Sequence, residues 1–278
     1  MTDTGMPDGT TVGRVALRVT DLDRVVGFYR DVIGLDLLDE GAGRATLGAG
    51  GASLLELIGD PDAPARGAAE TGLYHVAVRV PSRAALADAL ARIEDRWTLD
   101  GASDHLVSEA LYLADPEDNG VEVYCDRPRA SWPETEDGRV GMETVGLDLA
   151  DLRGCGPGAP GVPPETTVGH VHLEVSSLPA TRSFYAGALG LRVRQRYGDS
   201  ALFLAAGDYH HHVGANVWNH RTEPPTGRGL AWFELAVPAA EFPSVRERLH
   251  DHGVDVADRD DGVALTDPDG IAVRLRPA

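Results

Sequence analysis

Residues 15–38, VALRVTDLDRVVGFYRDVIGLDLL, recur later in the chain as residues 171–194, VHLEVSSLPATRSFYAGALGLRVR. The two stretches align at a constant shift of 156 residues. The matching positions are Val15/Val171, Leu17/Leu173, Val19/Val175, Leu22/Leu178, Phe28-Tyr29/Phe184-Tyr185 and Gly34-Leu35/Gly190-Leu191. Two further segments recur: LYHVAVRV (73–80) corresponds to LAWFELAV (230–237), and DPEDNGVEVY (115–124) corresponds to DPDGIAVRL (267–275). The chain therefore contains an internal duplication.

The two copies differ at three positions that carry metal-ligating side chains. The differing pairs are His170 against Arg14, His75 against Trp232, and Glu122 against Ala272. Each ligand-type residue is thus absent from the opposite copy, and together they make two histidines and one carboxylate. This is the ligand set of a non-haem Fe(II) site, and Mn(II) prefers the same nitrogen and oxygen donors.

Composition limits the partners and the compartment. The formal net charge of −19 argues against nucleic acid and against an anionic membrane as partners, because an acidic surface is repelled by both. The N-terminal residues MTDTGMPDGTT lack the basic and apolar regions of a signal peptide, so we expect a loose tail and a cytoplasmic protein. Cys125 and Cys155 have no CxxC spacing, so neither a disulfide framework nor a zinc knuckle is indicated.

The duplication predicts two domains, at residues 10–127 and 167–278, joined by a linker rich in Pro, Gly and acidic residues at 128–166. Within the linker we expect one short ordered stretch around METVGLDLADL (142–152). Each half opens with an alternating strand, VGRVALRV (12–19) or VGHVHLEV (168–175). A helix with a polar capping residue and a closing Gly follows, and then short strands.

A second unit of the same kind follows within each half. The chain therefore consists of four βαβββ modules, numbered one to four in chain order, and the predicted class is α+β with two half-barrel domains. Module two has its helix at 82–95 and strands at 109–115 and 120–125. Module four has its helix at 239–253 and strands at 262–267 and 271–277.

Four such modules with DP-x-G turns resemble the vicinal oxygen chelate superfamily, which includes glyoxalase I, extradiol dioxygenases and bleomycin-resistance proteins. The resemblance covers nearly the whole chain apart from the linker and the N-terminal tail. Four segments are similar to the short two-domain catechol-2,3-dioxygenases: GLYHVAV (72–78), DHLVSEALYLADPEDNGVEVYCDRPRASW (104–132), VGHVHLEV (168–175) and YHHHVGANVW (209–218).

The resemblance implies where the metal ligands lie. Proteins of this superfamily place them on the first strand of one module and on the first and last strands of its partner. His170 in module three, with His75 and Glu122 in module two, match those places. We therefore predict that module two pairs with module three and module one with module four within one chain, which brings all three residues into one barrel. A homodimer that exchanges halves between chains would satisfy the same condition, so the sequence leaves the oligomeric state open.

Three more residues are expected at the site because of the resemblance. His211, in the run His210–His212, corresponds to a histidine that manages protons as O2 is reduced, which places His210 and His212 on the opposite face. Tyr112 and His105 correspond to residues that hydrogen-bond the substrate hydroxyl.

Asn216 and Trp218 are candidates for the pocket wall or for packing. His172 shares a strand face with His170 and is the alternative ligand.

The predicted function is an extradiol dioxygenase that uses Fe(II) and O2 to open a catechol-type ring beside its hydroxyls. A metal-dependent lyase or isomerase of glyoxalase type is one alternative. Such an enzyme needs a second carboxylate as base, and Glu174 lies on the same strand face as His170 but farther along. A protein that binds an aromatic ligand without catalysis is the other alternative, and it predicts a pocket without metal ligands.

Overall fold

The structure is a computed structural model that describes residues 5–278. The chain divides into two compact units, one of residues 16–63 and 75–169, the other of residues up to 15 with 64–74 and 170–278. The domain boundaries at 127/128 and 166/167 stay a prediction. No helix among the described residues is both long and apolar enough to cross a membrane.

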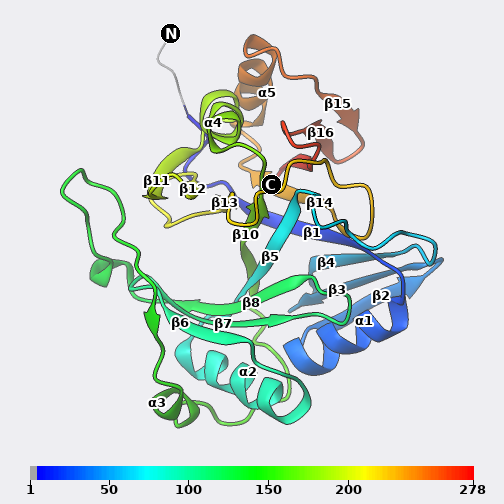
Figure 1. Ribbon diagram of the computed structural model, residues 1–278, viewed down its shortest axis with the longest axis vertical. Coiled ribbons are helices and arrows are strands. Elements are labelled where there is room, and N and C mark those ends of the chain that lie inside the picture. Colours follow the sequence, from blue (N-terminus) through cyan, green and yellow to red (C-terminus); the bar gives the residue numbers. More distant parts are fainter. Residues whose placement is uncertain (1–4) are drawn as a thin grey trace. The chain divides into compact units, whose positions relative to one another are not determined.

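Four βαβββ modules are present, as predicted (Figure 1). Module one comprises β1 (Thr11–Val19), α1 (Leu22–Phe28), β2 (Asp36–Gly41), β3 (Arg44–Ala49) and β4 (Ala52–Gly59). Module two comprises β5 (Gly72–Arg79), α2 (Arg83–Arg96), β6 (Gly101–Asp104), β7 (Ser108–Ala114) and β8 (Gly120–Asp126). Module three comprises β10 (Thr167–Glu174), α4 (Leu178–Arg182), β11 (Arg192–Tyr197), β12 (Ala201–Ala205) and β13 (Val213–Asn216). Module four comprises β14 (Gly229–Val237), α5 (Phe242–Asp251), β15 (Ala257–Arg259), β16 (Gly262–Thr266) and β17 (Ala272–Pro277).

The strand order assigns the modules to two sheets. One sheet runs β15-β16-β17-β14-β1-β4-β3-β2, and the other runs β11-β12-β13-β10-β5-β8-β7-β6-β9. Modules one and four therefore share the eight-stranded sheet, and modules two and three share the nine-stranded sheet. This confirms the α+β class and the module pairing that the distribution of ligand residues predicted.

The expected ordered stretch of the linker forms β9 (Val145–Gly146) and α3 (Leu149–Arg153). A 3-10 turn, η2 (Arg129–Ser131), lies at the start of the linker. β9 pairs antiparallel with β6, so the linker adds the last strand to that edge of the sheet. The expectation of a loose N-terminal tail is wrong at Met6. Residues 1–4 lie outside the described part of the chain, but Met6 is buried and its N–H donates to the carbonyl of Gly190 at 2.8 Å.

The first helix of each half begins as predicted. Asp21 accepts a hydrogen bond from the N–H of Arg24, and Ser177 accepts one from the N–H of Ala180. The helices then widen into single π turns, η1 (Tyr29–Ile33) and η3 (Ser183–Ala188), before Gly34 closes the first with φ 91°. The apolar spacing of the sequence did not reveal these π turns, which are short and rare in proteins.

One arginine of the following module donates hydrogen bonds to the carbonyls of each π turn. Arg92 of α2 donates to the carbonyls of Val32 and Ile33 at 3.3 and 2.9 Å. Arg248 of α5 donates to the carbonyls of Ala188 and Gly187 at 3.0 and 2.7 Å. The two arginines are again 156 residues apart. Burial, the largest influence, lowers the pKa of Arg92, while Asp88 opposes the shift. The duplication thus extends to polar contacts that join consecutive modules.

Candidate metal centre

His75 and Glu122 form a buried pair on neighbouring strands. β5 and β8 run parallel with Ala77 opposite Glu122, and His75 lies two residues before Ala77 on the same face. The distance from His75 Nε2 to Glu122 Oε2 is 2.9 Å, and the two residues are 6 % and 3 % exposed. Two nitrogen or oxygen ligands at about 2.1 Å from one ion and at right angles lie about 3 Å apart. The pair therefore fits a shared metal.

His170 is the third candidate donor. It lies on β10 and is buried, and the candidate ligand atoms of His75, Glu122 and His170 all lie within 4.8 Å of one another. Two neutral imidazoles and one carboxylate fit a divalent iron or manganese ion by donor type. The group includes His170 and not His172, which was the alternative on the same strand face.

His172 belongs to an aromatic cluster instead. Its ring centroid lies 5.1 Å from that of Tyr74 and 5.4 Å from that of Trp218, and Phe203 lies 5.7 Å away. Tyr74 and Trp218 are the exposed members of the cluster. Asn216 is fully buried, and its Oδ1 accepts the main-chain N–H of Trp218 at 3.1 Å.

Tyr112 and His105 lie beside the His75–Glu122 pair. Tyr112 on β7 stands directly opposite Glu122 on β8, so both side chains share one face of the sheet. The centroid of the Tyr112 ring is 5.8 Å from that of His75. The Tyr112 hydroxyl lies 2.6 Å from His105 Nε2, and the other ring nitrogen of His105 lies 2.8 Å from the Glu143 carbonyl.

The run His210–His212 is wholly buried, which excludes an adventitious surface metal site. The His211 ring packs on that of His170 at a centroid distance of 4.0 Å. The expectation that His210 faces away from His211 is wrong, because their Nδ1 atoms lie 2.7 Å apart. Strand alternation does not apply to these residues, because the run precedes β13, which begins at Val213. His212 Nδ1 accepts the N–H of Ala206 at 3.2 Å.

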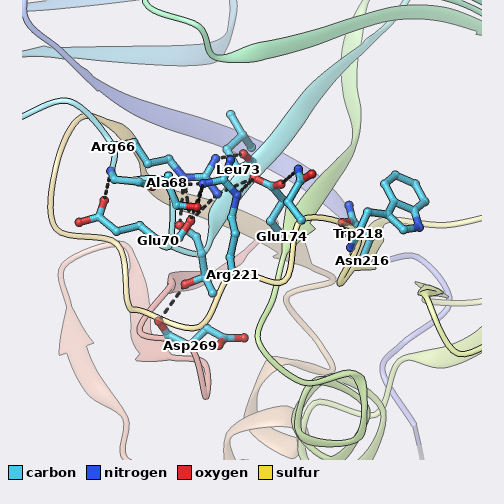
Figure 2. Close-up of polar contacts among 12 residues, drawn as sticks. Arg66, Ala68, Glu70, Leu73, Glu174, Asn216, Trp218, Arg221 and Asp269 are labelled. Atoms are coloured by element: carbon cyan, nitrogen blue, oxygen red, sulfur yellow. Dashed lines mark hydrogen bonds and ion pairs between the residues drawn. The ribbon is translucent and has the colours of Figure 1, made fainter.

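Glu174, the candidate base of a lyase, is engaged by two arginines (Figure 2). Its Oε2 lies 2.6 Å from Arg66 Nη2 and 2.8 Å from Arg221 Nε, and Asn219 also donates to the carboxylate. Arg66 and Arg221 in turn donate to main-chain carbonyls of the 67–73 segment. Burial, the largest influence, lowers the pKa of Arg66, while Glu174 opposes the shift. Sequence reasoning missed both arginines, because nothing in their local pattern marks them.

The family model of the glyoxalase/bleomycin resistance protein/dioxygenase superfamily matches residues 11–123 and 167–275. The chain belongs to this superfamily. It is also 36 % identical over 276 residues to a catechol-2,3-dioxygenase of Bacillus subtilis (strain 168), covering 95 % of this chain and 96 % of the relative.

Two solved structures have the same fold. A putative dioxygenase from Bacillus subtilis superposes with a TM-score of 0.66 at 15 % identity, covering 99 % of this chain and 86 % of that one. Glyoxalase I from Zea mays superposes with a TM-score of 0.58 at 15 % identity, covering 97 % and 92 %. These likenesses bear out the predicted arrangement of glyoxalase-like modules.

The corresponding positions in the eight-stranded sheet hold no ligand set. Arg14 and Trp232 stand there as predicted, but the counterpart of Glu122 is Arg274, not Ala272. Glu234, the counterpart of Ala77, is opposite Arg274 in the β14–β17 register. The alignment placed Ala272 there because it matched the glycines of the two DP turns. Both turns in fact have the same length, since Asp115 and Asp267 each accept the N–H four residues later.

Positive charge therefore replaces the ligands in this sheet. The Arg274 guanidinium carbon stacks 3.6 Å from the centroid of Trp232, and that of Arg14 lies 5.6 Å from it. Arg14 Nη2 lies 2.7 Å from Glu234 Oε2. Burial alone would raise the pKa of Glu234, but the hydrogen bonds from Arg14 and Arg276 outweigh it and lower the pKa. Two guanidinium groups repel a metal cation, so we expect no second ion here.

Proposed function

We propose that this protein is an extradiol-type dioxygenase that cleaves the ring of a catechol-like aromatic diol with O2, using Fe(II) held by His75, Glu122 and His170. The observation that carries the proposal is the group of three buried donors whose ligand atoms lie within 4.8 Å of one another. The likeness to a relative named catechol-2,3-dioxygenase supports the same reaction class.

The donor set determines the charge at the centre. One carboxylate and two neutral imidazoles leave a divalent ion with one net positive charge, which matches a catechol bound as its monoanion. When bound, the metal orients diol and O2 together and carries electron density from one to the other. Manganese satisfies the same donors, so exchange of the two metals in the purified protein decides between them.

Two neighbouring groups of the chain are placed to move or hold protons. His211 packs on the His170 ring, and its Nδ1 is engaged by His210, so a proton exchanged with the substrate passes through Nε2. Tyr112 lies beside His75 and opposite Glu122, where its phenol oxygen can hold a substrate hydroxyl. Positioned acid–base groups of this kind contribute about 10²- to 10⁴-fold to a rate.

The lyase alternative lacks its base, because Glu174 is held in ion pairs with Arg66 and Arg221. The binding-protein alternative predicts a pocket without ligand-type residues, and the group of three buried donors disfavours it.

The test is anaerobic loading with Fe(II) followed by catechol and O2, with oxygen uptake and the yellow ring-opened semialdehyde measured together. We expect product from the wild type and none from His75→Ala. His211→Ala should retain iron while kcat falls by roughly 10²-fold or more. Bound iron without oxygen uptake would contradict the dioxygenase and favour a lyase. A chain that binds no metal would contradict the site itself and favour a ligand-binding protein.

A further inference from the structure

The linker between the two halves lies along the edge of the candidate site, against His105. β9 pairs with β6, with Val145 opposite Asp104. The Glu143 N–H donates to the main-chain carbonyl of His105 at 3.4 Å. The Glu143 carbonyl in turn lies 2.8 Å from His105 Nδ1, and the Thr144 hydroxyl lies 3.4 Å from the same nitrogen. A main-chain carbonyl and a threonine hydroxyl of the linker thus lie against the outer side of the imidazole.

A main-chain carbonyl can only accept a hydrogen bond, so it requires His105 Nδ1 to carry the hydrogen. In a neutral imidazole the other nitrogen is then an acceptor. His105 Nε2 lies 2.6 Å from the Tyr112 hydroxyl oxygen, and the hydroxyl must therefore be the donor of that bond. The contact with Glu143 in this way sets the direction of the bond between His105 and Tyr112.

The backbone around His105 is held by several independent contacts. Leu106 adopts the left-handed region with φ 68°, which is uncommon for a residue with a branched side chain. The Asp104 carboxylate accepts the Leu106 N–H at 2.8 Å and the Arg127 guanidinium at 2.6 Å. The His105 N–H donates to the Ser108 carbonyl at 2.8 Å. Strained backbone that several contacts hold in place is typical of functional sites, where it fixes the direction of a side chain.

We propose that the linker segment Glu143–Val145 is a positioning element that fixes His105 as the Nδ1–H tautomer and thereby commits the Tyr112 hydroxyl hydrogen to His105. Tyr112 then presents lone pairs, and not its hydrogen, to the candidate metal centre. The next step rests on the proposed function. A catechol bound as its monoanion keeps one protonated hydroxyl, and Tyr112 accepts a hydrogen bond from that hydroxyl. The substrate must then be a diol with a free second hydroxyl, and its monomethyl ether is a poor ligand.

Long-range ¹H–¹⁵N correlation of selectively ¹⁵N-histidine-labelled, metal-free protein near pH 8 tests the proposal without turnover. The His105 signals are those lost in His105→Asn. We expect a hydrogen on Nδ1 and an acceptor-type Nε2 in the wild type. Tyr112→Phe should keep this tautomer, because the Glu143 carbonyl sets it. Glu143→Ala should also keep it, since only main-chain atoms of Glu143 make the contact.

Glu143→Pro removes the N–H that donates to His105 and restricts the preceding residue, so the preference for Nδ1–H should weaken. A wild-type hydrogen on Nε2, or on both nitrogens, would overturn the proposal. Loss of the Nδ1–H tautomer in Tyr112→Phe would also overturn it, because the tyrosine would then be the determinant. In iron-loaded protein, Glu143→Pro should lower kcat about tenfold at unchanged iron content.

These results separate the two claims. Absence of ring cleavage by the wild type would contradict the proposed function and leave the tautomer result intact. Equal affinity for catechol and its monomethyl ether, in a protein that cleaves catechol and shows the expected tautomer, would contradict only the acceptor role of Tyr112.

Discussion

Two buried tyrosine–aspartate pairs join the modules of each half. The Tyr29 hydroxyl lies 3.4 Å from Asp115, and the Tyr185 hydroxyl donates to Asp267 at 3.0 Å. The sequence showed the repeated tyrosines and the repeated DP turns as separate features. The turn interpretation is correct, since each aspartate accepts N–H groups of its own turn. The link to the tyrosine could not be predicted, because it joins residues more than 80 positions apart.

Asp267 should make stability depend on pH. Burial is the main cause that raises the pKa of Asp267, to about 6, against the hydrogen bonds it accepts. The Asp267 carboxyl keeps its proton up to about pH 6 in the native state but only up to about pH 4 in the unfolded chain. The protonated carboxyl therefore stabilises the native state below pH 4, and this stabilisation is lost as pH rises through 6. The free energy of unfolding of Asp267→Asn should therefore rise by about 3 kcal/mol relative to that of the wild type between pH 4 and pH 8.

Urea unfolding of both proteins across this range measures the difference, with the exposed Asp260→Asn as the matched control. A difference that stays constant with pH would show that Asp267 titrates normally in the folded chain.

Glu174 shows how a residue with the right chemistry can be structural. Glu174 is 3 % exposed and its carboxylate pairs with Arg66 and Arg221, so Glu174→Gln leaves two guanidinium groups without their counter-charge. We expect this change to lower the free energy of unfolding by about 3 kcal/mol, in the range for a broken buried ion pair. Bound metal per folded chain should stay the same. Loss of metal from a folded Glu174→Gln protein would contradict the structural role.

At the scale of elements, the sequence predicted the helices, their caps and most strands. Asp21 and Ser177, each one of two candidates, are the residues that cap the two short helices. The short strands β6 and β15 were not located, because GASD and ADR carry no alternating apolar pattern. The π turns and the arginines that bind their carbonyls were also missed, since both depend on contacts between modules.

The repeated arginines offer a matched pair of variants. Arg92 is buried and Arg248 is half-buried, and each donates to carbonyls at the end of a π turn. Removing either leaves polar groups without these donors, at a cost of about 1–3 kcal/mol for buried ones. Arg92→Ala should therefore lower the free energy of unfolding more than Arg248→Ala. The order is measured by urea unfolding at one pH, and the reverse order would contradict the account of the π turns.

At the scale of the whole molecule, the two copies have diverged so that the candidate metal ligands lie in modules two and three. Because three ligand-type residues were each missing from the opposite copy, the sequence predicted that modules two and three share a sheet, and the strand order confirms it. The exact counterpart of Glu122 was predicted wrongly, because only the register of β14 and β17 identifies Arg274. The ion pairs around Arg14 and Glu174 could not be predicted, since their partners are distant in sequence.

The most direct test of the central claim is the amount of iron bound per chain after anaerobic loading and removal of excess metal. We expect one iron for the wild type and for His172→Ala, and none for His170→Ala, with circular dichroism confirming that both variants are folded. Two irons in the wild type, or iron retained by folded His170→Ala and lost by His172→Ala, would contradict the assignment of His75, Glu122 and His170 as the metal site.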